Sequence, residues 1–394
     1  MISVLPGVMA LVERVPHKVL LFIPHLQQGG AERQILELMR RLPERFDPIL
    51  CLYGDESRHH YDDYLANGTA LRSLGVRAMG PKGLRRLVRL LRDETPTILH
   101  SYRDKANFWA RVATFWARVP IVLTSVRNRK QGFLGTLAEY FLQRTSSRVL
   151  TNSVGVQEEL VEWAGVPKDR VQIIHNFLDL QKFRPAENED ERQAARAQFG
   201  FLPNELVLLM PGRLARQKHQ LGLAAALRIL KQRRALPDHV RIVLAGRRRD
   251  KWYSRVVPIA MRFAGVEHHV TYLEPVKEMC RLYHACDAVV MPSLWEGMSN
   301  AVLESQACGV PAVVSHAANR DGIVIHDESG FEVPTANRHR LADALQRVID
   351  MSPEQRRLMG ARGRAHVAAR FHPDRILEEL ISLYDGLLAE KGLA

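Results

Sequence analysis

The chain has 394 residues, of which 46% are hydrophobic and 25% are charged. This length suits two domains of ordinary size, and the composition is that of a globular protein rather than a disordered or fibrous one. No apolar run in the sequence approaches the roughly 18 residues that a membrane-spanning helix needs. Residues 1–15 are mildly apolar but lack a basic start and a clear cleavage site, so we expect no signal peptide.

The positive charge is concentrated in one part of the chain. The formal net charge is +13, and residues 80–148 alone hold 14 Lys and Arg against 4 Asp and Glu. Such a region attracts nucleic acid, anionic lipid headgroups or phosphorylated substrates, unless it is merely a solvated basic face. The chain has no nucleic-acid recognition motif, and its aromatic residues are not interleaved with the basic cluster. We therefore expect no nucleic-acid partner.

The four cysteines are scattered. Cys51, Cys280, Cys286 and Cys308 include no CxxC pair. Thiols without the spacing of metal ligands are typical of reduced proteins of the cytosol. We therefore expect a cytoplasmic location and no zinc or other metal site.

Apolar runs and amphipathic patterns alternate along the first half as in an α/β protein. Strands are expected at 18–24, 48–52, 98–100, 121–125, 148–151 and 171–174, and helices at 31–42, 83–92 and 106–118. The helix at 83–92 is amphipathic, since its leucines and Val88 share one face while its four arginines lie mostly outward.

A second α/β series makes up the rest of the chain. It follows a segment, 186–196, that is rich in Glu, Asp, Asn and Gln, and we place a linker just before or within this segment. Strands are expected at 207–210, 240–245, 270–273, 288–291 and 312–315, and helices at 221–234, 338–350, 353–370 and 373–391. The sequence thus predicts two similar α/β halves.

Two loops that follow strands have the residues of an anion site. Gly29 and Gly30 allow a backbone to approach a ligand closely at a helix N-terminus, although a plain strand-to-helix turn would look the same. In the second half, Arg213 and Lys218 are five residues apart in a loop that leads into a helix. This spacing can bring two cations onto one diphosphate, because Arg binds its oxygens bidentately and Lys acts as a compact charge.

Two carboxylates follow the strand expected at 288–291. Glu296 lies in the loop after the strand, and Glu304 lies inside the first turns of the next helix. Both are at the carboxyl end of a parallel strand, where ligands bind in open α/β sheets. Acids at a helix start also stabilise the helix dipole without any ligand. The Gly, Ser and Asn residues between the two acids favour a ligand, since they leave backbone N–H groups open.

With these pieces assembled, the chain resembles the retaining glycosyltransferases of family 4 (group-1 type), which have the two-domain GT-B fold. The motifs that carry the resemblance are Gly29-Gly30-Ala31-Glu32-Arg33, Ile174-His175-Asn176-Phe177-Leu178-Asp179, Gly212-Arg213-Leu214 with Lys218, Leu282-Tyr283-His284-Ala285-Cys286-Asp287, the stretch from Glu296 to Glu304, and Ser329-Gly330-Phe331-Glu332-Val333-Pro334. They occur in the family's order from about Lys18 to the C-terminus.

The resemblance implies a role for each matching residue. Glu296 would accept hydroxyls of the donor sugar and Glu304 both hydroxyls of the ribose. Arg213 and Lys218 would neutralise the donor diphosphate, with Gly29 and Gly30 facing it from the other domain. The backbone of Gly297, Met298, Ser299 and Asn300 would help to bind the sugar, and the loop around Pro275 would hold the base. Neither a metal nor another cofactor is implied, because the protein's own cations serve the phosphates.

The sequence departs from the family pattern on the acceptor side. Many relatives have a histidine after the strand at 121–125, where this chain has Arg127 in a cluster with Arg129 and Lys130. We expect Arg127 and Arg129 to contact a phosphate or another acidic group of the acceptor. His100 falls in a second histidine region of the family, at a strand end, and is a further acceptor-side candidate.

The resemblance implies a retaining hexosyltransferase that moves a sugar from a UDP-hexose or UDP-N-acetylhexosamine to a lipid-linked or cell-surface glycan precursor. A soluble small-molecule acceptor, a nucleotide-sugar epimerase and a phosphorylase are the alternatives. We expect an acceptor-binding domain at residues 1–184, a nucleotide-sugar-binding domain at 185–372 and a C-terminal helix at 373–394 that packs back on the first domain. The basic region 80–148 predicts a peripheral position at the inner face of the cell membrane.

Overall fold

A computed structural model describes residues 15–26, 30–54, 68, 70–127, 133–248 and 250–394. The chain forms two compact units. The first comprises Met1–Ser125, Leu142–Val149 and Tyr384–Ala394, and the second comprises Val126–Phe141 and Leu150–Leu383. The domain limits expected from the sequence stay a prediction.

The N-terminal sheet has seven strands in the order β3-β2-β1-β4-β5-β6-β7. The strands are β1 (His17–Ile23), β2 (Phe46–Leu52), β3 (Ala70–Ser73), β4 (Ile98–Tyr102), β5 (Ile121–Val126), β6 (Arg148–Thr151) and β7 (Val171–Ile173). β1 pairs in parallel with β2 on one side and with β4 on the other, so the direction of strand addition reverses there. A reversal of this kind opens a crevice at the carboxyl ends of the two strands.

Within the part of the chain that the structure describes, five helices accompany these strands. They are α1 (Gly30–Arg41), α3 (Pro81–Glu94), α4 (Asp104–Ala113), α5 (Phe133–Leu142) and α6 (Val154–Glu162). The predicted amphipathic character of α3 is confirmed: Leu87 and Leu91 are buried, whereas Arg85, Arg89 and Arg92 are exposed. The sequence did not predict α5, α6 or the short edge strand β3, which has no buried residue.

The C-terminal sheet has six parallel strands in the order β10-β9-β8-β11-β12-β13. The strands are β8 (Leu206–Pro211), β9 (Val240–Ala245), β10 (Val270–Leu273), β11 (Ala288–Met291), β12 (Ala312–Ser315) and β13 (Gly330–Val333). The predicted bounds of β9, β10, β11 and β12 are confirmed. β8 has β9 on one side and β11 on the other, which places a second crevice at the carboxyl ends of β8 and β11.

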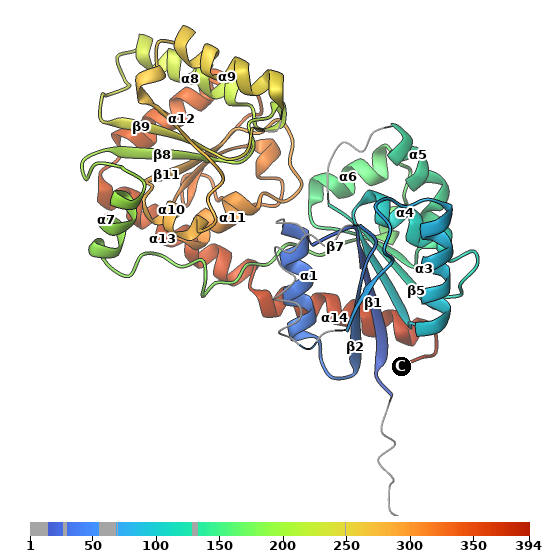
Figure 1. Ribbon diagram of the computed structural model, residues 1–394. Coiled ribbons are helices and arrows are strands. Elements are labelled where there is room, and N and C mark those ends of the chain that lie inside the picture. The colour runs from blue at the N-terminus through green and yellow to red at the C-terminus, as the bar shows by residue number, and fades with distance from the viewer. Residues whose placement is uncertain (1–14, 27–29, 55–67, 69, 128–132, 249) are drawn as a thin grey trace, which may run out of the picture. The chain divides into compact units, whose positions relative to one another are not determined.

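Helices cover both faces of this sheet (Figure 1). One face carries α8 (Gln220–Gln232), α9 (Lys251–Phe263) and α12 (Arg338–Asp350), and the other carries α10 (Met279–His284), α11 (Asn300–Ala307) and α13 (Pro353–Arg370). β8, β11 and β12 are buried on both faces, as their continuous apolar runs require, whereas the edge strand β10 is half-buried. The bounds expected for α12 and α13 are confirmed; α9 was not predicted, and its interior Pro258 hides the helical pattern.

The polar segment at 186–196 is helical for most of its length. α7 runs from Glu189 to Gln198, with Asn188 as its N-cap. Arg196 of this helix is buried and donates to the carbonyl oxygens of Leu202 and Ala285. A linker within the helical residues is therefore wrong, because α7 is anchored in the second unit. The alternative, a linker just before the segment, stays a prediction.

The last helix, α14 (Pro373–Glu390), ends against the N-terminal sheet. Tyr384 is fully buried, and its hydroxyl lies 2.7 Å from Nδ1 of His100. Asp385 pairs with Arg45 at 2.8 Å, beside the start of β2. The prediction that the C-terminal helix packs back on the N-terminal half is thus confirmed. Within the described ranges, no helix is both long and apolar enough to cross a membrane.

Candidate active site

The carboxylate of Glu296 lies at the centre of a hydrogen-bonded group beyond β11. Only 7% of Glu296 is exposed. Lys218 Nζ lies 2.6 Å from its Oε1, and the hydroxyl of Ser293 donates to the same oxygen at 2.8 Å. The side-chain amide of Gln217 donates to Oε2 at 3.1 Å. The carboxylate is thus neutralised by one ammonium group and held by two neutral donors.

The loop that carries the cations starts with a glycine because of its backbone. Gly212 follows β8 with a φ of +128°, and a Cβ there would lie 2.9 Å from Cε of Lys218. Gly246, at the end of β9, has a φ of +151°, and its Cβ would lie 2.4 Å from the carbonyl oxygen of Gly212. Both positions require glycine, since side chains would strain the backbone and collide with the loop. The two glycines let the loops after β8 and β9 approach closely.

Gln217 joins the two expected cations to Glu296. Its Oε1 accepts from Nη2 of Arg213 at 3.3 Å, while its Nε2 donates to Glu296 and, at 3.0 Å, to the carbonyl oxygen of Trp295. Backbone contact supports the arrangement, because Leu294 N–H donates to the carbonyl oxygen of Gln217 at 2.8 Å. The structure therefore brings together Arg213, Lys218 and Glu296 at the carboxyl ends of β8 and β11.

Glu304 lies farther along, within α11. The hydroxyl of Tyr283 donates to its Oε2 at 3.0 Å. Burial raises the pKa of Tyr283 well above its ordinary value, and the neighbouring Glu304 charge adds to the effect. Tyr283 is therefore a firm hydrogen-bond donor at neutral pH, and it fixes one oxygen of the Glu304 carboxylate.

The residues between the two acids form the start of α11. Gly297 has no room for a side chain, because a Cβ would lie 2.6 Å from the carbonyl oxygen of Arg127. Met298 and Ser299 are buried, with Ser299 as the N-cap. Asn300 accepts a hydrogen bond from the Asn176 side chain at 2.7 Å. The expected sugar-binding backbone is thus a tightly packed turn.

The other residues expected to bind the donor are Pro275, Gly29 and Gly30. Pro275 is exposed and follows β10, the outermost strand of the C-terminal sheet. Gly30 is the first residue of α1, and Gly29 lies outside the described residues. The structure therefore neither adds to nor alters their expected roles.

On the expected acceptor side, His100 is only 1% exposed. Besides its contact with Tyr384, its Nε2 lies 2.8 Å from the hydroxyl of Ser125, and its ring stacks on Tyr102. Arg127 donates to Oδ1 of Asn176 at 3.2 Å, and Arg129 lies outside the described residues. The roles expected for His100, Arg127 and Arg129 stay predictions.

A charged cluster lies at the crevice of the N-terminal sheet, around Glu32, which belongs to a motif that we identified from the sequence without assigning this residue a role. Glu32 of α1 is fully buried and accepts a hydrogen bond from Arg103, which follows β4. Nδ1 of His25, just after β1, lies 3.7 Å from Glu32 Oε1. Burial lowers the pKa of His25, and the charge of Arg103 lowers it further. Arg103 has a φ of +76°, which is unusual for a residue with a side chain and is typical of functional sites.

Sequence reasoning also missed the neutral donors of the C-terminal site. Gln217 stands beside Lys218, and Ser293 stands in the Pro-Ser break after β11, but polar residues are common in loops. Tyr283 belongs to a motif that we identified without assigning it a role. Gln217, Ser293 and Tyr283 each donate a hydrogen bond to an expected site residue, and only the folded structure reveals these contacts.

Matches to known families cover both halves of the chain. The model of the family described as "Glycosyl transferases group 1" matches residues 191–366, and that of "Glycosyltransferase Family 4" matches residues 28–182. An Escherichia coli protein, UDP-Gal:alpha-D-GlcNAc-diphosphoundecaprenol alpha-1,3-galactosyltransferase, is 26% identical over 337 residues, which are 82% of this chain and 85% of that protein. A D-inositol 3-phosphate glycosyltransferase of Pseudarthrobacter chlorophenolicus is 31% identical over 54% of this chain and 50% of its own length.

Solved structures share the fold. Anabaena Alr3699/HepE in complex with UDP and glucose superimposes with a TM-score of 0.81 at 19% identity, over 94% of this chain and all of that chain. A glycosyltransferase from Rickettsia africae gives the same TM-score at 17% identity, over 95% of this chain and 99% of its own. The fold and the family predicted from the sequence are confirmed. The chain belongs to glycosyltransferase family 4 (group-1 type), and it is a transferase with two Rossmann-like domains in the GT-B fold.

Proposed function

We propose that the protein transfers a hexose or N-acetylhexosamine, with retention, from a UDP-sugar to a phosphate-bearing glycan precursor attached to a lipid. The observation that carries the proposal is the group formed by Lys218, Gln217 and Glu296, with Arg213 attached, at the crevice of the C-terminal sheet. The named activity of the Escherichia coli relative supports a UDP-sugar donor and a lipid-diphosphate acceptor.

Arg213 and Lys218 stabilise the leaving diphosphate. As the bond between the sugar and the diphosphate breaks, negative charge develops on the departing phosphate. Arg213 and Lys218 stabilise that charge as it grows, so they act on the transition state more than on the bound donor. Because the protein supplies these cations, we propose that transfer needs no metal ion.

The carboxylates of Glu296 and Glu304 accept hydrogen bonds from hydroxyl groups of the donor. Glu304, oriented by Tyr283, accepts hydrogen bonds from the ribose hydroxyls, and Glu296 accepts them from the donor sugar. Both oxygens of Glu296 are already engaged by Lys218, Ser293 and Gln217. This engagement argues against Glu296 as a covalent nucleophile of the glycosidase kind. The leaving phosphate would then remove the acceptor proton on the face from which it departs, which retains the anomeric configuration.

The acceptor side is basic and partly aromatic. Arg85, Arg89 and Arg92 are exposed on α3, and Arg92 donates at 2.8 Å to the carbonyl oxygen of Trp116, which is 55% exposed beside Phe115 at 64%. Arginines next to exposed aromatic rings are typical of surfaces that lie at a membrane interface. We therefore place the protein at the cytoplasmic face of a membrane, with this surface toward anionic headgroups.

A soluble phosphorylated acceptor is the second candidate. The relatives named D-inositol 3-phosphate glycosyltransferases favour it, because arginine side chains suit an inositol phosphate as well as a lipid diphosphate. An epimerase or a phosphorylase is the remaining alternative.

The test is a scan of nucleotide sugars by thermal shift, followed by an assay for release of free nucleotide. We expect a UDP-sugar to raise Tm, and nucleotide release to require a lipid-diphosphate acceptor. Release with inositol phosphate alone would select the soluble acceptor. Interconversion of the donor sugar without an acceptor would select an epimerase, and a need for inorganic phosphate would select a phosphorylase. The configuration of the product, read by NMR, tests retention.

A further inference from the structure

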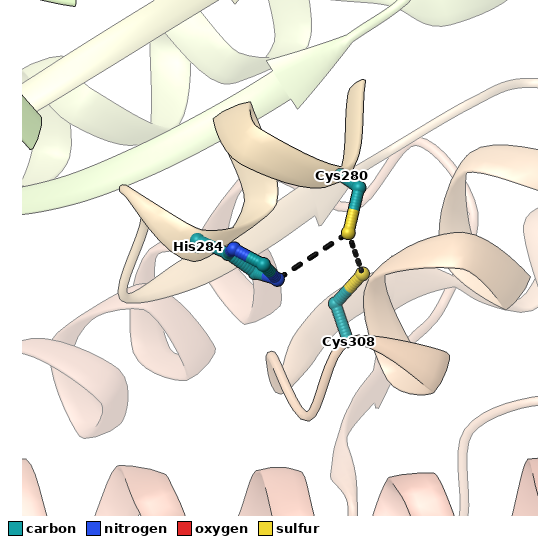
Figure 2. Close-up of side chains that lie close together, drawn as sticks. All are labelled: Cys280, His284 and Cys308. Atoms are coloured by element: carbon teal, nitrogen blue, oxygen red, sulfur yellow. Dashed lines mark hydrogen bonds between the residues drawn. The ribbon is translucent and has the colours of Figure 1, made fainter. Parts of the chain in front are cut away.

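Two thiols and an imidazole lie close together between α10, which carries Tyr283, and the end of α11, which carries Glu304. Figure 2 shows Cys280 and His284 on α10 pointing toward Cys308, which follows the last residue of α11. Cys280 and His284 are four residues apart, so they share one face of the helix. His284 and Cys308 are buried and Cys280 is half-buried. The sulfur and nitrogen atoms of the three side chains all lie within 4.8 Å of one another.

Two of the three distances match the edges of a tetrahedral site, and the third is within 4.8 Å. Cys280 Sγ lies 3.7 Å from Cys308 Sγ and 3.3 Å from Nε2 of His284. Zinc bonds of about 2.3 Å to sulfur and about 2.0 Å to nitrogen place two sulfurs about 3.8 Å apart and a sulfur and a nitrogen about 3.5 Å apart. One ion at the centre of the three atoms would thus need only small movements of side chains.

The surroundings of His284 supply what a metal-bound imidazole needs. Its Nδ1 is buried without a hydrogen-bond partner among the described residues, and Oε1 of Glu191 is 3.8 Å away. When a metal takes Nε2, the ring proton must be on Nδ1, where a carboxylate usually accepts it. The carbonyl oxygen of Arg184 lies 2.7 Å from Nε2 and 3.7 Å from Cys280 Sγ, so it is a candidate for the fourth ligand.

An ion can reach the cluster from solvent. A groove of about 820 Å³ opens at the amino ends of the C-terminal strands, and His284 and Cys308 are part of its lining. Arg192 and Asp287 line the same groove. An entry path of this kind is one requirement for a site that exchanges metal.

We propose that Cys280, His284 and Cys308 bind one zinc ion, with the Arg184 carbonyl or a water molecule as the fourth ligand. Two thiolates and an imidazole are the ligand set that zinc prefers. Binding transfers the two thiol protons to solvent and requires neutral His284. The sequence predicted no zinc site because the ligands have no CxxC spacing; the fold joins them across 28 residues.

The ion has a structural role. It ties the end of α11 to α10, and these helices present Glu304 and Tyr283: the N–H of Cys308 donates to the Glu304 carbonyl oxygen at 3.0 Å, and Tyr283 precedes His284. Zinc therefore stabilises the second unit and fixes the pair of side chains at one end of the crevice. This inference goes beyond the proposed function and does not rest on it.

The test measures metal bound to the reduced full chain. We expect one zinc per chain by mass spectrometry of the metal content. Cobalt(II) should give a thiolate charge-transfer band and the intense visible bands of a tetrahedral ion, and zinc should remove both. Zinc should raise Tm and a chelator should reverse the rise, since a ligand of the folded state stabilises it.

Matched variants locate the site. Cys280→Ser and Cys308→Ser should remove the charge-transfer band or weaken binding strongly. Cys286→Ala removes a buried thiol two residues from His284 that donates to the Leu282 carbonyl, and it should bind zinc as the parent chain does. Glu191→Gln should lower the affinity about 10- to 100-fold, the usual effect of losing the partner of a ligand histidine.

Three results would overturn the proposal. One is a reduced parent chain that takes up neither zinc nor cobalt at micromolar concentration, which needs no variant to fold. Another is unchanged binding by both cysteine variants that retain the parent circular dichroism spectrum. The third is a Cys280–Cys308 disulfide, found by peptide mass mapping, in a chain that binds no metal after reduction; the pair would then be a redox couple.

Discussion

At the scale of single residues, the C-terminal crevice depends on charges that compensate one another before any substrate arrives. The side chain of Lys218 is 13% exposed and that of Glu296 is 9% exposed, and they are 2.6 Å apart. In the proposed reaction, an incoming diphosphate would compete for Lys218, and an incoming sugar hydroxyl would compete for Glu296. The ion pair means that neither side chain is an isolated buried charge in the free protein, and we propose that both exchange partners when the donor binds.

Lys218→Met should reduce kcat about 100- to 1,000-fold, the usual effect of removing one donor to a developing anion. Arg216→Met is the matched control, because Arg216 is an exposed cation two residues away in the same loop. We expect the control to keep kcat within about 2-fold, since exposed charges contribute little. Equal losses in the two variants would mean that loop charge in general, and not Lys218 at its position, supports transfer.

Substitutions of Glu296 and Glu304 should have different effects on kcat and KM. Glu304→Ala should raise the KM for the donor, because ribose contacts are the same in the ground state and the transition state. Glu296→Ala should lower kcat as well, since it contacts the sugar that reacts and holds Lys218. Small and equal effects from both substitutions would reduce the acids to stabilisers of the α11 N-terminus.

Charge and spacing in the sequence were enough to predict that three site candidates lie together, while their roles stay predictions. Arg213 and Lys218 follow a strand, and Glu296 follows another, so topology alone places all three at one crevice. Gln217 and Ser293 carry no charge and suit any loop, so nothing marked them. Cys280, His284 and Cys308 were missed because their proximity depends on how α10 packs beside α11.

At the scale of elements, α7 shows how a polar segment becomes part of a core. Asp287, between α10 and β11, accepts from Arg192 at 2.7 Å and Arg196 at 3.3 Å, and it accepts from the Val207 N–H of β8 at 2.8 Å. Composition predicted a linker here because most of the helix is polar. The two arginines donate hydrogen bonds to the nearly buried carboxylate of Asp287. Asp287 is next to α7 only in the folded protein, so the sequence of α7 does not reveal this interaction.

Asp287→Ala should lower the free energy of unfolding by about 3–5 kcal/mol, since it leaves the buried guanidinium charge of Arg196 without its carboxylate partner. Asp343→Ala breaks the Arg233–Asp343 pair, whose side chains are 40% and 42% exposed, and should cost about 0–1 kcal/mol. Urea denaturation of both variants measures the difference. A cost for Asp287→Ala no larger than for Asp343→Ala would show that the network does not anchor α7.

The start of α8 should make the fold sensitive to acid. His219 precedes the helix in the left-handed conformation, with a φ of +62°, and burial lowers its pKa from the ordinary value of 6.5. Its neutral form therefore contributes stability that is fully present above pH 6.5 and is lost as the pH falls through the lowered value in the folded state. Asn also tolerates this backbone conformation, so His219→Asn should unfold with a smaller loss of stability from about pH 8 to about pH 5. Parallel pH profiles for the two proteins would contradict this assignment.

At the scale of the whole molecule, charge distribution predicts where the protein works. The basic region 80–148 combines the exposed arginines of α3 with exposed aromatic side chains, including Trp116, Tyr140 and Phe141. The sequence revealed the charge but not the aromatic exposure, because an apolar residue in a helix is usually expected to face the core. The two-sheet architecture was predictable from the alternation of strands and helices.

The chain should float with vesicles that contain acidic lipid and not with neutral ones, and salt should release it. Each Lys or Arg near such a surface is worth about 1 kcal/mol, so Arg85→Glu with Arg89→Glu should weaken binding more than 10-fold. Arg357→Glu with Arg362→Glu, exposed changes on α13, is the matched control and should bind as the parent chain does. Absent or salt-insensitive binding of the parent chain would rule out electrostatic attachment.

The return of α14 to the first unit has a consequence for biosynthesis. Tyr384 is buried against His100, and Tyr384–Ala394 are part of a unit that otherwise comes from the first 149 residues. A ribosome that adds about 5–20 residues per second needs on the order of tens of seconds to travel from the early strands to this tyrosine. During that interval the surface that Tyr384 covers, at His100 and Phe46, stays exposed while the second unit is made and can fold. Residues that emerge late therefore complete the first unit, and chaperones that shield apolar surface would act during this interval.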